Sequence, residues 1–201
     1  MLRVLFWNIN KKPLAEQLRQ LCQVHEVDIL VLAECEMLDD ELLPALNKDA
    51  ERTFINPENP SDRLSFIIRP PDAPFKLVSD TKHCAIRAIT TPSGKDILLV
   101  AIHFPSKLYQ TTESQALLMT RIASQVREAE GRQGHTRTIV IGDLNMNPFE
   151  PGVCSSEGLH AVICKDVANK ETRTVDGEDR LFFYNPMWNF LGDETRGPPG
   201  T

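Results

Sequence analysis

The chain has 201 residues, of which 41% are hydrophobic and 25% are charged. These proportions are ordinary for a globular protein with a sizeable core, and the length predicts a single domain spanning residues 1–201. The formal net charge of -6 excludes a nucleic-acid binder that is basic on every side, so any contact with DNA would need a local patch or a bound cation.

Neither a membrane anchor nor a secretion signal is apparent in the sequence. No apolar run approaches the length of a membrane-spanning helix, and the run at residues 2–7 is too short for the apolar part of a signal peptide. The five cysteines show no Cys-x-x-Cys spacing and lie mostly in apolar runs. Reduced thiols of this kind are typical of the cytosol, so we expect a cytoplasmic protein without a membrane partner.

The first part of the chain contains two apolar runs with a helical pattern between them. The apolar run at residues 2–7 is followed by Asn8, and the run at residues 27–33 is followed by Glu34. Between these runs, Pro13 suits the first turn of a helix, and the apolar residues after it recur at helical spacing.

A short helix over residues 38–48, interrupted at Pro44, is expected next, followed by strands separated by turns rich in proline. The candidate strands are residues 51–56, 63–69, 75–80 and 83–90. Their succession predicts an antiparallel meander. Its basic residues could meet a substrate backbone, although scattered cations in strands usually form a solvated face; they are Arg63, Lys76, Lys82, His83 and Arg87.

Two more apolar runs follow, and both also stop at polar residues. The run at residues 96–102 is followed by His103. The run at residues 138–141 is followed by a glycine and then by Asp143 and Asn145. Side chains alternate in an extended segment, so Asp143 and Asn145 are expected to point the same way.

The segments around these runs predict a helix and two loops. Thr112 and Gln115 have the spacing of a capping box at the start of a helix. The loop before this helix carries Lys107 and Tyr109, which could contact phosphate or simply anchor the loop. Residues 165–180 are polar and are expected to form a loop.

Polar side chains thus follow four apolar runs, each at the point where a strand would stop. A ligand-binding edge forms where buried strands end, so one pocket could be lined by Asn8, Glu34, His103, Asp143 and Asn145. This set suits phosphoester hydrolysis, because a hard divalent cation such as Mg²⁺ or Mn²⁺ prefers a few carboxylate oxygens and water.

Each of these residue types suits one part of such a reaction. We expect Glu34 to be the metal ligand, with Asn8 beside it, and Asp143 to orient and deprotonate the attacking water. Asn8 and Asn145 can hold water or phosphate oxygens without adding repulsive charge, and His103 can donate a hydrogen bond to the scissile phosphate.

The four strand ends resemble, in order, the motifs of the endonuclease/exonuclease/phosphatase superfamily, whose fold is that of deoxyribonuclease I. The segments are W-N-I-N at 7–10, L-A-E at 32–34, A-I-H-F-P-S-K at 101–107 and I-G-D-L-N-M-N-P at 141–148. The resemblance implies an α/β fold in which two mixed β-sheets pack face to face and are flanked by helices, as a four-layer sandwich. It also implies a phosphate-side Asn8, a metal ligand Glu34, a phosphate-binding His103 and a catalytic pair, Asp143 and Asn145.

The resemblance further implies Mg²⁺- or Mn²⁺-dependent hydrolysis of a phosphodiester, and we expect a nuclease that acts on DNA. The same kind of site in the family also acts on phospholipid headgroups and inositol phosphates. A phosphatase acting on a small phosphorylated molecule is therefore the alternative enzyme.

The sequence departs from the family at one motif, because the closing Ser-Asp-His triplet of the family does not occur in it. We therefore expect a domain with its last strands missing, completed by further residues or by a partner chain, or else a non-catalytic interaction module in a larger complex. The last part of the sequence carries aromatic residues that either pack a loop or stack nucleobases, namely Phe182, Phe183, Tyr184, Trp188 and Phe190.

Overall fold

The structure is a computed structural model that describes residues 2–57, 63–69 and 74–187. The chain divides into two compact units. The first unit consists of Met1–Phe104 and Glu128–Leu144, and the second consists of Pro105–Arg127 and Asn145–Thr201. The single domain expected from the length stays a prediction.

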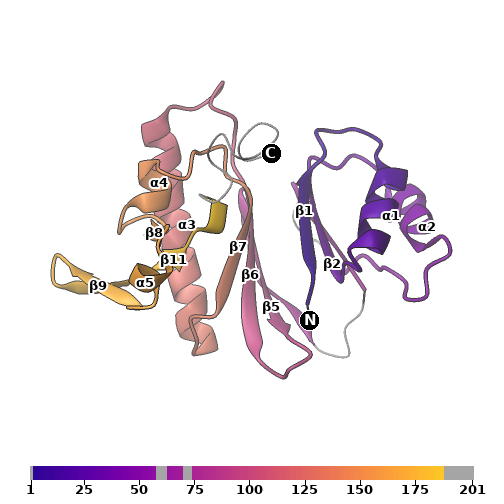
Figure 1. Ribbon diagram of the computed structural model, residues 1–201. Helices are drawn as coiled ribbons and strands as arrows, with labels where there is room; N and C mark the ends of the chain where they lie inside the picture. Colours follow the sequence, from indigo (N-terminus) through magenta and orange to yellow (C-terminus); the bar gives the residue numbers. More distant parts are fainter. Residues whose placement is uncertain (1, 58–62, 70–73, 188–201) are drawn as a thin grey trace. The chain divides into compact units, whose positions relative to one another are not determined.

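The first unit contains a three-stranded sheet in the order β1-β2-β3, of which Figure 1 labels β1 and β2. β1 (Val4–Asn8) and β2 (Ile29–Ala33) are parallel, and β3 (Leu64–Ile68) runs antiparallel to β2. Every residue of β2 is buried, as its uninterrupted apolar run predicts for a strand covered on both faces.

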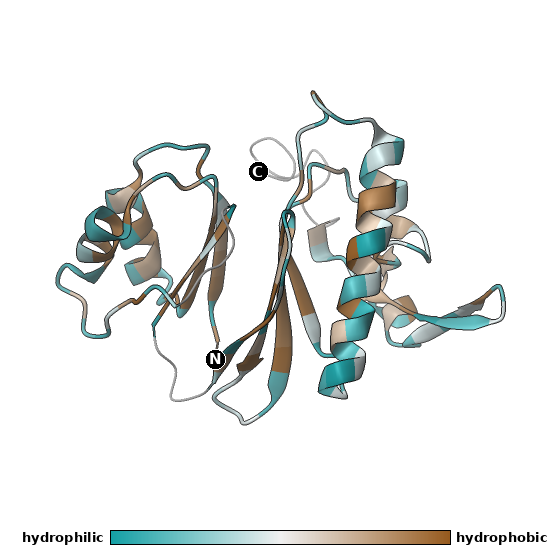
Figure 2. Cartoon of the chain, turned by 180° about the vertical axis from the view of Figure 1, so that it is seen from behind, coloured by the Kyte–Doolittle hydropathy of each residue, from teal (hydrophilic) through white to brown (hydrophobic). Residues whose placement is uncertain are grey.

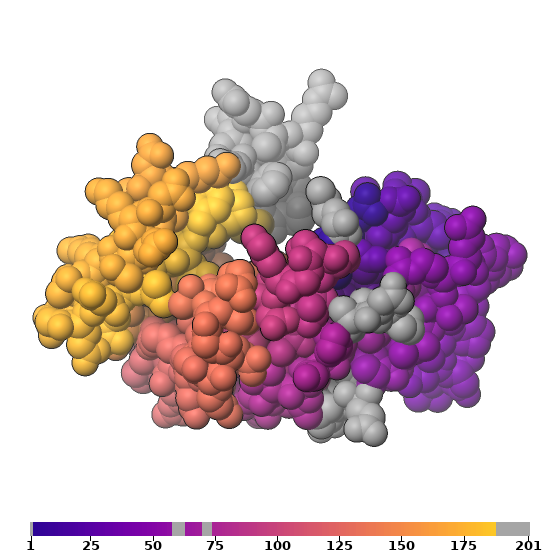
Figure 3. Space-filling view, turned by 90° about the horizontal axis from the view of Figure 1, so that it is seen from below, coloured from indigo at the N-terminus to yellow at the C-terminus, as the bar shows by residue number. Residues whose placement is uncertain are grey.

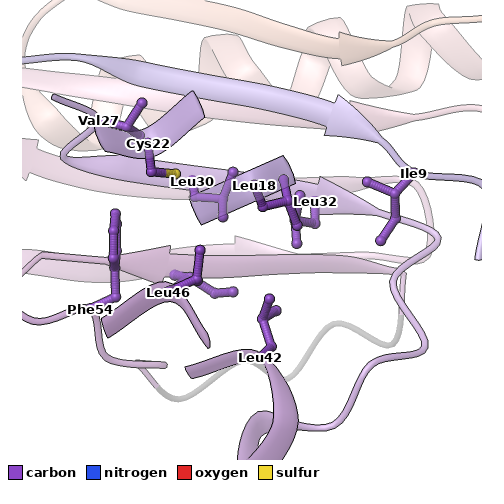
Figure 4. Close-up of a cluster of buried hydrophobic side chains, with 10 residues drawn as sticks. Ile9, Leu18, Cys22, Val27, Leu30, Leu32, Leu42, Leu46 and Phe54 are labelled. Carbon is purple, nitrogen blue, oxygen red and sulfur yellow. The ribbon is translucent and has the colours of Figure 1, made fainter. Parts of the chain in front are cut away.

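Two helices cover one face of this sheet, and both were predicted from the sequence, although the second continues through Pro44, where an interruption was expected. In α1 (Ala15–Val24) the buried residues are Leu18 and Cys22, one turn apart, and in α2 (Asp39–Asn47) they are Leu42 and Leu46. These four side chains join a core cluster with alternate residues of β2 (Figure 4). Each fully buried leucine stabilises the fold by roughly 1.5–3 kcal/mol.

The second sheet of this unit has four strands in the order β4-β5-β6-β7. β4 and β5 and also β5 and β6 are antiparallel, whereas β6 and β7 are parallel. The strands are β4 (Phe75–Asp80), β5 (Cys84–Thr90), β6 (Asp96–His103) and β7 (Thr138–Asp143).

The two sheets pack face to face through a second core cluster, and their central strands are strongly hydrophobic (Figure 2). This cluster combines Val31 and Phe66 of the first sheet with Leu99 and Ala101 of the second. The predicted fold class is therefore confirmed, because two mixed sheets pack together and helices flank them.

The predicted meander was wrong in its pairing. β3 pairs with β2 in the first sheet, whereas β4 begins the second sheet, and residues 51–56 contribute only an isolated bridge between Ile55 and Ile68. Turn residues indicate where strands stop, but they do not indicate which sheet each strand joins, because pairing is decided by contacts distant in sequence.

Arg87 takes neither of the roles left open for it, because it faces neither a substrate nor solvent. It is 1% exposed, and its guanidinium donates to both carboxylate oxygens of Asp80 at 2.5 and 3.0 Å. The same guanidinium lies 4.4 Å from the ring centroid of Phe66. Because Arg87 and Asp80 belong to the second sheet and Phe66 to the first, this contact links the sheets.

The helix predicted after residue 112 is α3 (Thr112–Gln133), but the predicted capping box does not form. Thr111 caps the helix instead, because its Oγ1 accepts from the backbone N–H of Ser114 at 3.3 Å. The side chain of Gln115 donates to the backbone oxygen of Pro105 at 3.0 Å.

The described part of the second unit, which ends at residue 187, also contains two short helices and two small sheets. The helices are α4 (Pro151–Cys154) and α5 (Lys165–Ala168). β8 (Ala161–Val162) is parallel to β11 (Phe183–Tyr184). Trp188 and Phe190 of the aromatic group lie outside the described residues.

Residues 165–180 do not form the loop that was expected. After α5, β9 (Thr172–Val175) and β10 (Glu178–Leu181) form an antiparallel hairpin whose side chains are mostly exposed (Figure 3). Asp176 and Gly177 make its turn with φ of 50° and 81°. Asp-Gly is the sequence signal for such a turn, and the polarity of the flanking residues masked it.

Within the part of the chain that is described, no helix combines the length and the apolar character needed to cross a bilayer. All five cysteines are free thiols. A cytoplasmic location stays a prediction.

Gly142 allows β7 to approach β6 closely, and this makes a first prediction possible. Its φ is +147°, and a Cβ at this position would lie 2.0 Å from the backbone oxygen of Ile102. We expect Gly142→Ala to lower the free energy of unfolding by about 3 kcal/mol, because the backbone next to Asp143 must shift. Urea denaturation at constant pH measures this change.

The matched control is Gly131→Ala in α3, where a Cβ would meet nothing within 4 Å. This variant should be as stable as the wild type or more stable by up to about 1 kcal/mol, since alanine favours helix. Equal effects at the two glycines would contradict the close approach.

Candidate active site

Four of the five predicted residues come together in the first unit, at the carboxyl ends of its strands. Asn8 ends β1 and His103 ends β6, while Glu34 directly follows β2 and Asp143 ends β7. His103 and Asp143 are partners in the ladder between β6 and β7. β1 of the first sheet lies against β7 of the second, which brings Asn8 to Asp143.

The side-chain amide of Asn8 lies between two carboxylates. Its Nδ2 donates to Glu34 Oε1 at 3.2 Å and to Asp143 Oδ2 at 3.0 Å. Its Oδ1 accepts from the backbone N–H of Asn10 at 3.0 Å, which fixes the orientation of the amide. A neutral group with two N–H donors can satisfy both acids without adding charge.

Glu34 adopts a backbone conformation that is unfavourable for its residue type. Its φ is +52°, in the left-handed region, where a residue with a Cβ is disfavoured by roughly 1–2 kcal/mol. The facing loop is also left-handed at Asn10 and Lys11, and the N–H of Lys11 donates to the backbone oxygen of Glu34 at 2.9 Å. Backbone strain of this kind concentrates at functional sites, where the surrounding structure maintains it.

His103 is 7% exposed and reaches the cluster through its ring. Its Nε2 lies 3.1 Å from Glu34 Oε1, on the oxygen that Asn8 also contacts. Its backbone N–H donates to the oxygen of His83 at 3.0 Å, and Nδ1 of His83 lies 3.1 Å from the oxygen of His103. Burial lowers the pKa of His83. His83 therefore fixes the end of β6.

Asn145 is not brought into this cluster by the alternation that the sequence suggested. β7 ends at Asp143, and Asn145 has φ of +48° and belongs to the second unit. Side chains alternate only in extended backbone, so the argument from spacing does not apply to Asn145. Its participation stays a prediction.

Lys107 and Tyr109 both lie in the second unit, and Lys107 is engaged in an ion pair. Its Nζ donates to Glu150 Oε1, which also accepts from the backbone N–H and Nδ2 of Asn147 at 3.2 and 2.8 Å. This pairing favours the anchoring role that was left open for Lys107. Tyr109 is 83% exposed.

Glu150 was missed by the sequence analysis, although it is buried and holds three donors on one oxygen. Burial acts to raise the pKa of this carboxyl, but the Lys107 ammonium and the Asn147 donors outweigh it and hold the pKa below the ordinary value of 4.5. The available signal was the spacing of Asn147 and Glu150, in which an acid three residues ahead can accept from the earlier backbone N–H.

The first unit offers few ligands to a cation. Nowhere in residues 2–57, 63–69 and 74–187 do three His, Cys, Asp or Glu side chains gather to hold a metal ion by themselves. Glu34 Oε2 makes no hydrogen bond to the described residues, and the side chain is 31% exposed. One open carboxylate oxygen suits a hard cation that keeps most of its water, but not a tetrahedral zinc site.

Comparisons with known proteins agree with this fold. The family model described as "Endonuclease/Exonuclease/phosphatase family" matches residues 5–199. A comparison with curated protein sequences gives no match.

Several solved structures are similar in fold. The human nocturnin catalytic domain with bound sulfate has 19% identity and a TM-score of 0.53, covering 75% of this chain and 66% of that one. Truncated Caenorhabditis elegans TDP2 has 16% identity and a TM-score of 0.52, covering 73% of this chain and 63% of that one. A Staphylococcus aureus beta toxin has 14% identity and a TM-score of 0.51, covering 87% of this chain and 73% of that one. The chain thus spans less than two thirds of the length of the nocturnin domain and of TDP2.

The bridging amide makes a second prediction possible. In Asn8→Asp, a third carboxylate replaces the donor shared by Glu34 and Asp143. We expect this variant to lose about 2 kcal/mol of unfolding free energy at pH 7, because two acids lose their donor and repulsion is added. Urea denaturation in the presence of a chelator measures the loss.

The matched control is Asn10→Asp, which adds the same charge at an exposed position two residues away. Its unfolding free energy should change by less than about 0.5 kcal/mol. A similar loss in both variants would mean that net charge, not the position between the two acids, decides stability.

The lowered pKa of Glu150 predicts a dependence of stability on pH in the second unit. A carboxyl whose pKa is lower in the folded state stabilises the fold above its ordinary value of 4.5, and this contribution is lost as pH falls through the folded pKa. We expect Glu150→Gln to lower the unfolding free energy by about 1–2 kcal/mol at pH 7, and the difference from the wild type to shrink below pH 4.5.

Glu157→Gln is the control in the same unit, since Glu157 pairs with Arg180 but its side chain is 54% exposed. Exposed ion pairs contribute little, so this variant should follow the wild type throughout the pH series. A difference for Glu150→Gln that persists unchanged at low pH would contradict the lowered pKa.

Proposed function

The chain belongs to the endonuclease/exonuclease/phosphatase family, and we propose that it is a phosphodiesterase that hydrolyses DNA with Mg²⁺ or Mn²⁺. Members of this family are generally phosphoesterases, and divalent cations such as Mg²⁺ are their usual cofactors. The observation that carries the proposal is the amide of Asn8 between Glu34 and Asp143, at strand ends that are distant in sequence.

Glu34 would hold the cation, with Asn8 beside it. Such a cation supplies charge stabilisation to the phosphoryl oxygens of the substrate. The donor set fits this use, because one carboxylate oxygen of Glu34 is occupied by N–H donors while the other is open. Mg²⁺ and Mn²⁺ commonly take one or two protein carboxylates and complete their coordination with water and substrate phosphate.

Asp143 would orient the attacking water and accept its proton. Its position at the end of β7 is fixed on both sides, since its backbone oxygen accepts from the N–H of Phe104 at 2.9 Å and its carboxylate accepts from Asn8. A general base needs this fixed position more than it needs any particular neighbour. Asn145 would hold a phosphate oxygen.

Two lysines support a polyanionic substrate. Lys11 and Lys12 follow Asn8 closely, and both are exposed. Lys11 forms an ion pair with Glu36, 2.7 Å away, and this hydrogen bond raises the pKa of the lysine. Exposed cations beside a phosphoester site favour a nucleic-acid backbone over a small ester, because more than one phosphate is then contacted.

The test is incubation of the purified protein with supercoiled, linear and single-stranded DNA, each with Mg²⁺, Mn²⁺ or chelator. We expect nicking or degradation that requires the metal and falls by a factor of about 10³ in Asp143→Asn, because the amide cannot accept the proton. The variant keeps the shape of the side chain, so its thermal unfolding serves as the check on folding.

Asp96→Asn is the matched control, since Asp96 is an exposed acid at the opposite end of β6 from His103. It should cleave at the wild-type rate. Phosphate release from small esters without any DNA cleavage would show that the protein is a phosphatase and not a nuclease. Absence of metal-dependent hydrolysis of both substrates would favour a non-catalytic interaction module.

A further inference from the structure

One oxygen of Glu34 receives two N–H donors, and the other receives none. Asn8 Nδ2 lies 3.2 Å and His103 Nε2 lies 3.1 Å from Oε1. Oε2 has no hydrogen-bond partner among the described residues, although the side chain is only 31% exposed. A carboxylate held in this way is turned so that Oε2 is the oxygen offered to a ligand.

The contact with Glu34 places a proton on Nε2 of His103, because an ionised carboxylate can only accept a hydrogen bond. Nδ1 is buried without a hydrogen-bond partner among the described residues. The Nε2–H of the ring is therefore used by Glu34 and is not available to a phosphate.

Hydrogen bonds of the backbone fix the position from which the ring of His103 extends. The backbone of His103 is bonded on both its N–H and its oxygen to His83, and the next N–H, of Phe104, donates to the oxygen of Asp143. The His103 side chain is 8% exposed. Turning the ring toward solvent would therefore break the contact with Glu34 without offering Nδ1 any partner in the described part of the unit.

We propose that His103 is a positioning residue that holds Oε1 of Glu34, so that Oε2 faces the cation. This differs from the phosphate-binding role that the family resemblance implies for His103. The cation in this statement rests on the proposed function, whereas the link between His103 and Glu34 does not. Partners of a ligating side chain commonly change metal affinity 10–100-fold when they are removed.

The first experiment measures Mn²⁺ binding directly, by calorimetry, without substrate. His103→Leu should weaken Mn²⁺ binding by about 10-fold or more, because Oε1 loses a donor. His103→Gln should restore the affinity to within about threefold of the wild type, since its amide N–H₂ can donate to Glu34 as Nε2 does. His25→Leu, at an exposed histidine that follows α1, should bind as the wild type does.

The substrate dependence separates positioning from direct contact. At saturating Mn²⁺, the KM for DNA should be the same in the wild type and in His103→Gln. An unchanged Mn²⁺ affinity in His103→Leu, together with a loss of activity in both variants at saturating Mn²⁺, would overturn the proposal in favour of phosphate contact.

The second experiment needs neither metal nor substitution. Nitrogen-15 NMR of the metal-free wild type should show a proton on Nε2 of His103. A ring that carries a proton on Nδ1 and none on Nε2 would overturn the proposal, even if His103→Leu proved too unstable to study. If the wild type bound no Mn²⁺, the proposed function would fail, and the tautomer would still decide whether His103 holds Glu34.

Discussion

A neutral amide held between two acids is the interaction on which this site depends. Asn8 and Asp143 are 135 positions apart in the sequence, yet their side chains lie 3.0 Å apart. They meet only because the two sheets pack face to face and set β1 against β7. The carboxylates of Glu34 and Asp143 repel each other, and the two N–H groups of the one amide that contacts both offset that repulsion without introducing a charge.

The site contains local strain that the strands around it can support. Glu34 has a left-handed backbone conformation and directly follows β2, all of whose residues are buried. Gly142 lies too close to the backbone of Ile102 to carry a side chain. Burial of apolar strands contributes far more free energy than these two conformations remove. The strained residues therefore occur where the strands stop, next to the polar side chains that the strands carry.

The positions of these polar side chains could be predicted from the sequence, but their partners could not. Asn8, Glu34, His103 and Asp143 each end an apolar run, and local pattern suffices to see this. That β3 joins β2, or that Arg87 is buried against Phe66, depends on contacts between distant segments. Asn145 shows the limit of a spacing argument, because alternation holds only while the backbone stays extended, and β7 ends two residues earlier.

The geometry at Glu34 has a thermodynamic consequence for the proposed reaction. With Oε1 occupied by Asn8 and His103, Glu34 offers a cation one oxygen, and no group of three acidic, His or Cys ligands supplements it among the described residues. A cation held by so few protein ligands gains its remaining contacts from water and from the substrate phosphate. Its affinity and that of the substrate must then increase together, because linkage requires each ligand to strengthen the binding of the other by the same factor. In this cluster an amide separates the two acids. We therefore expect the protein to bind the metal weakly in the absence of substrate.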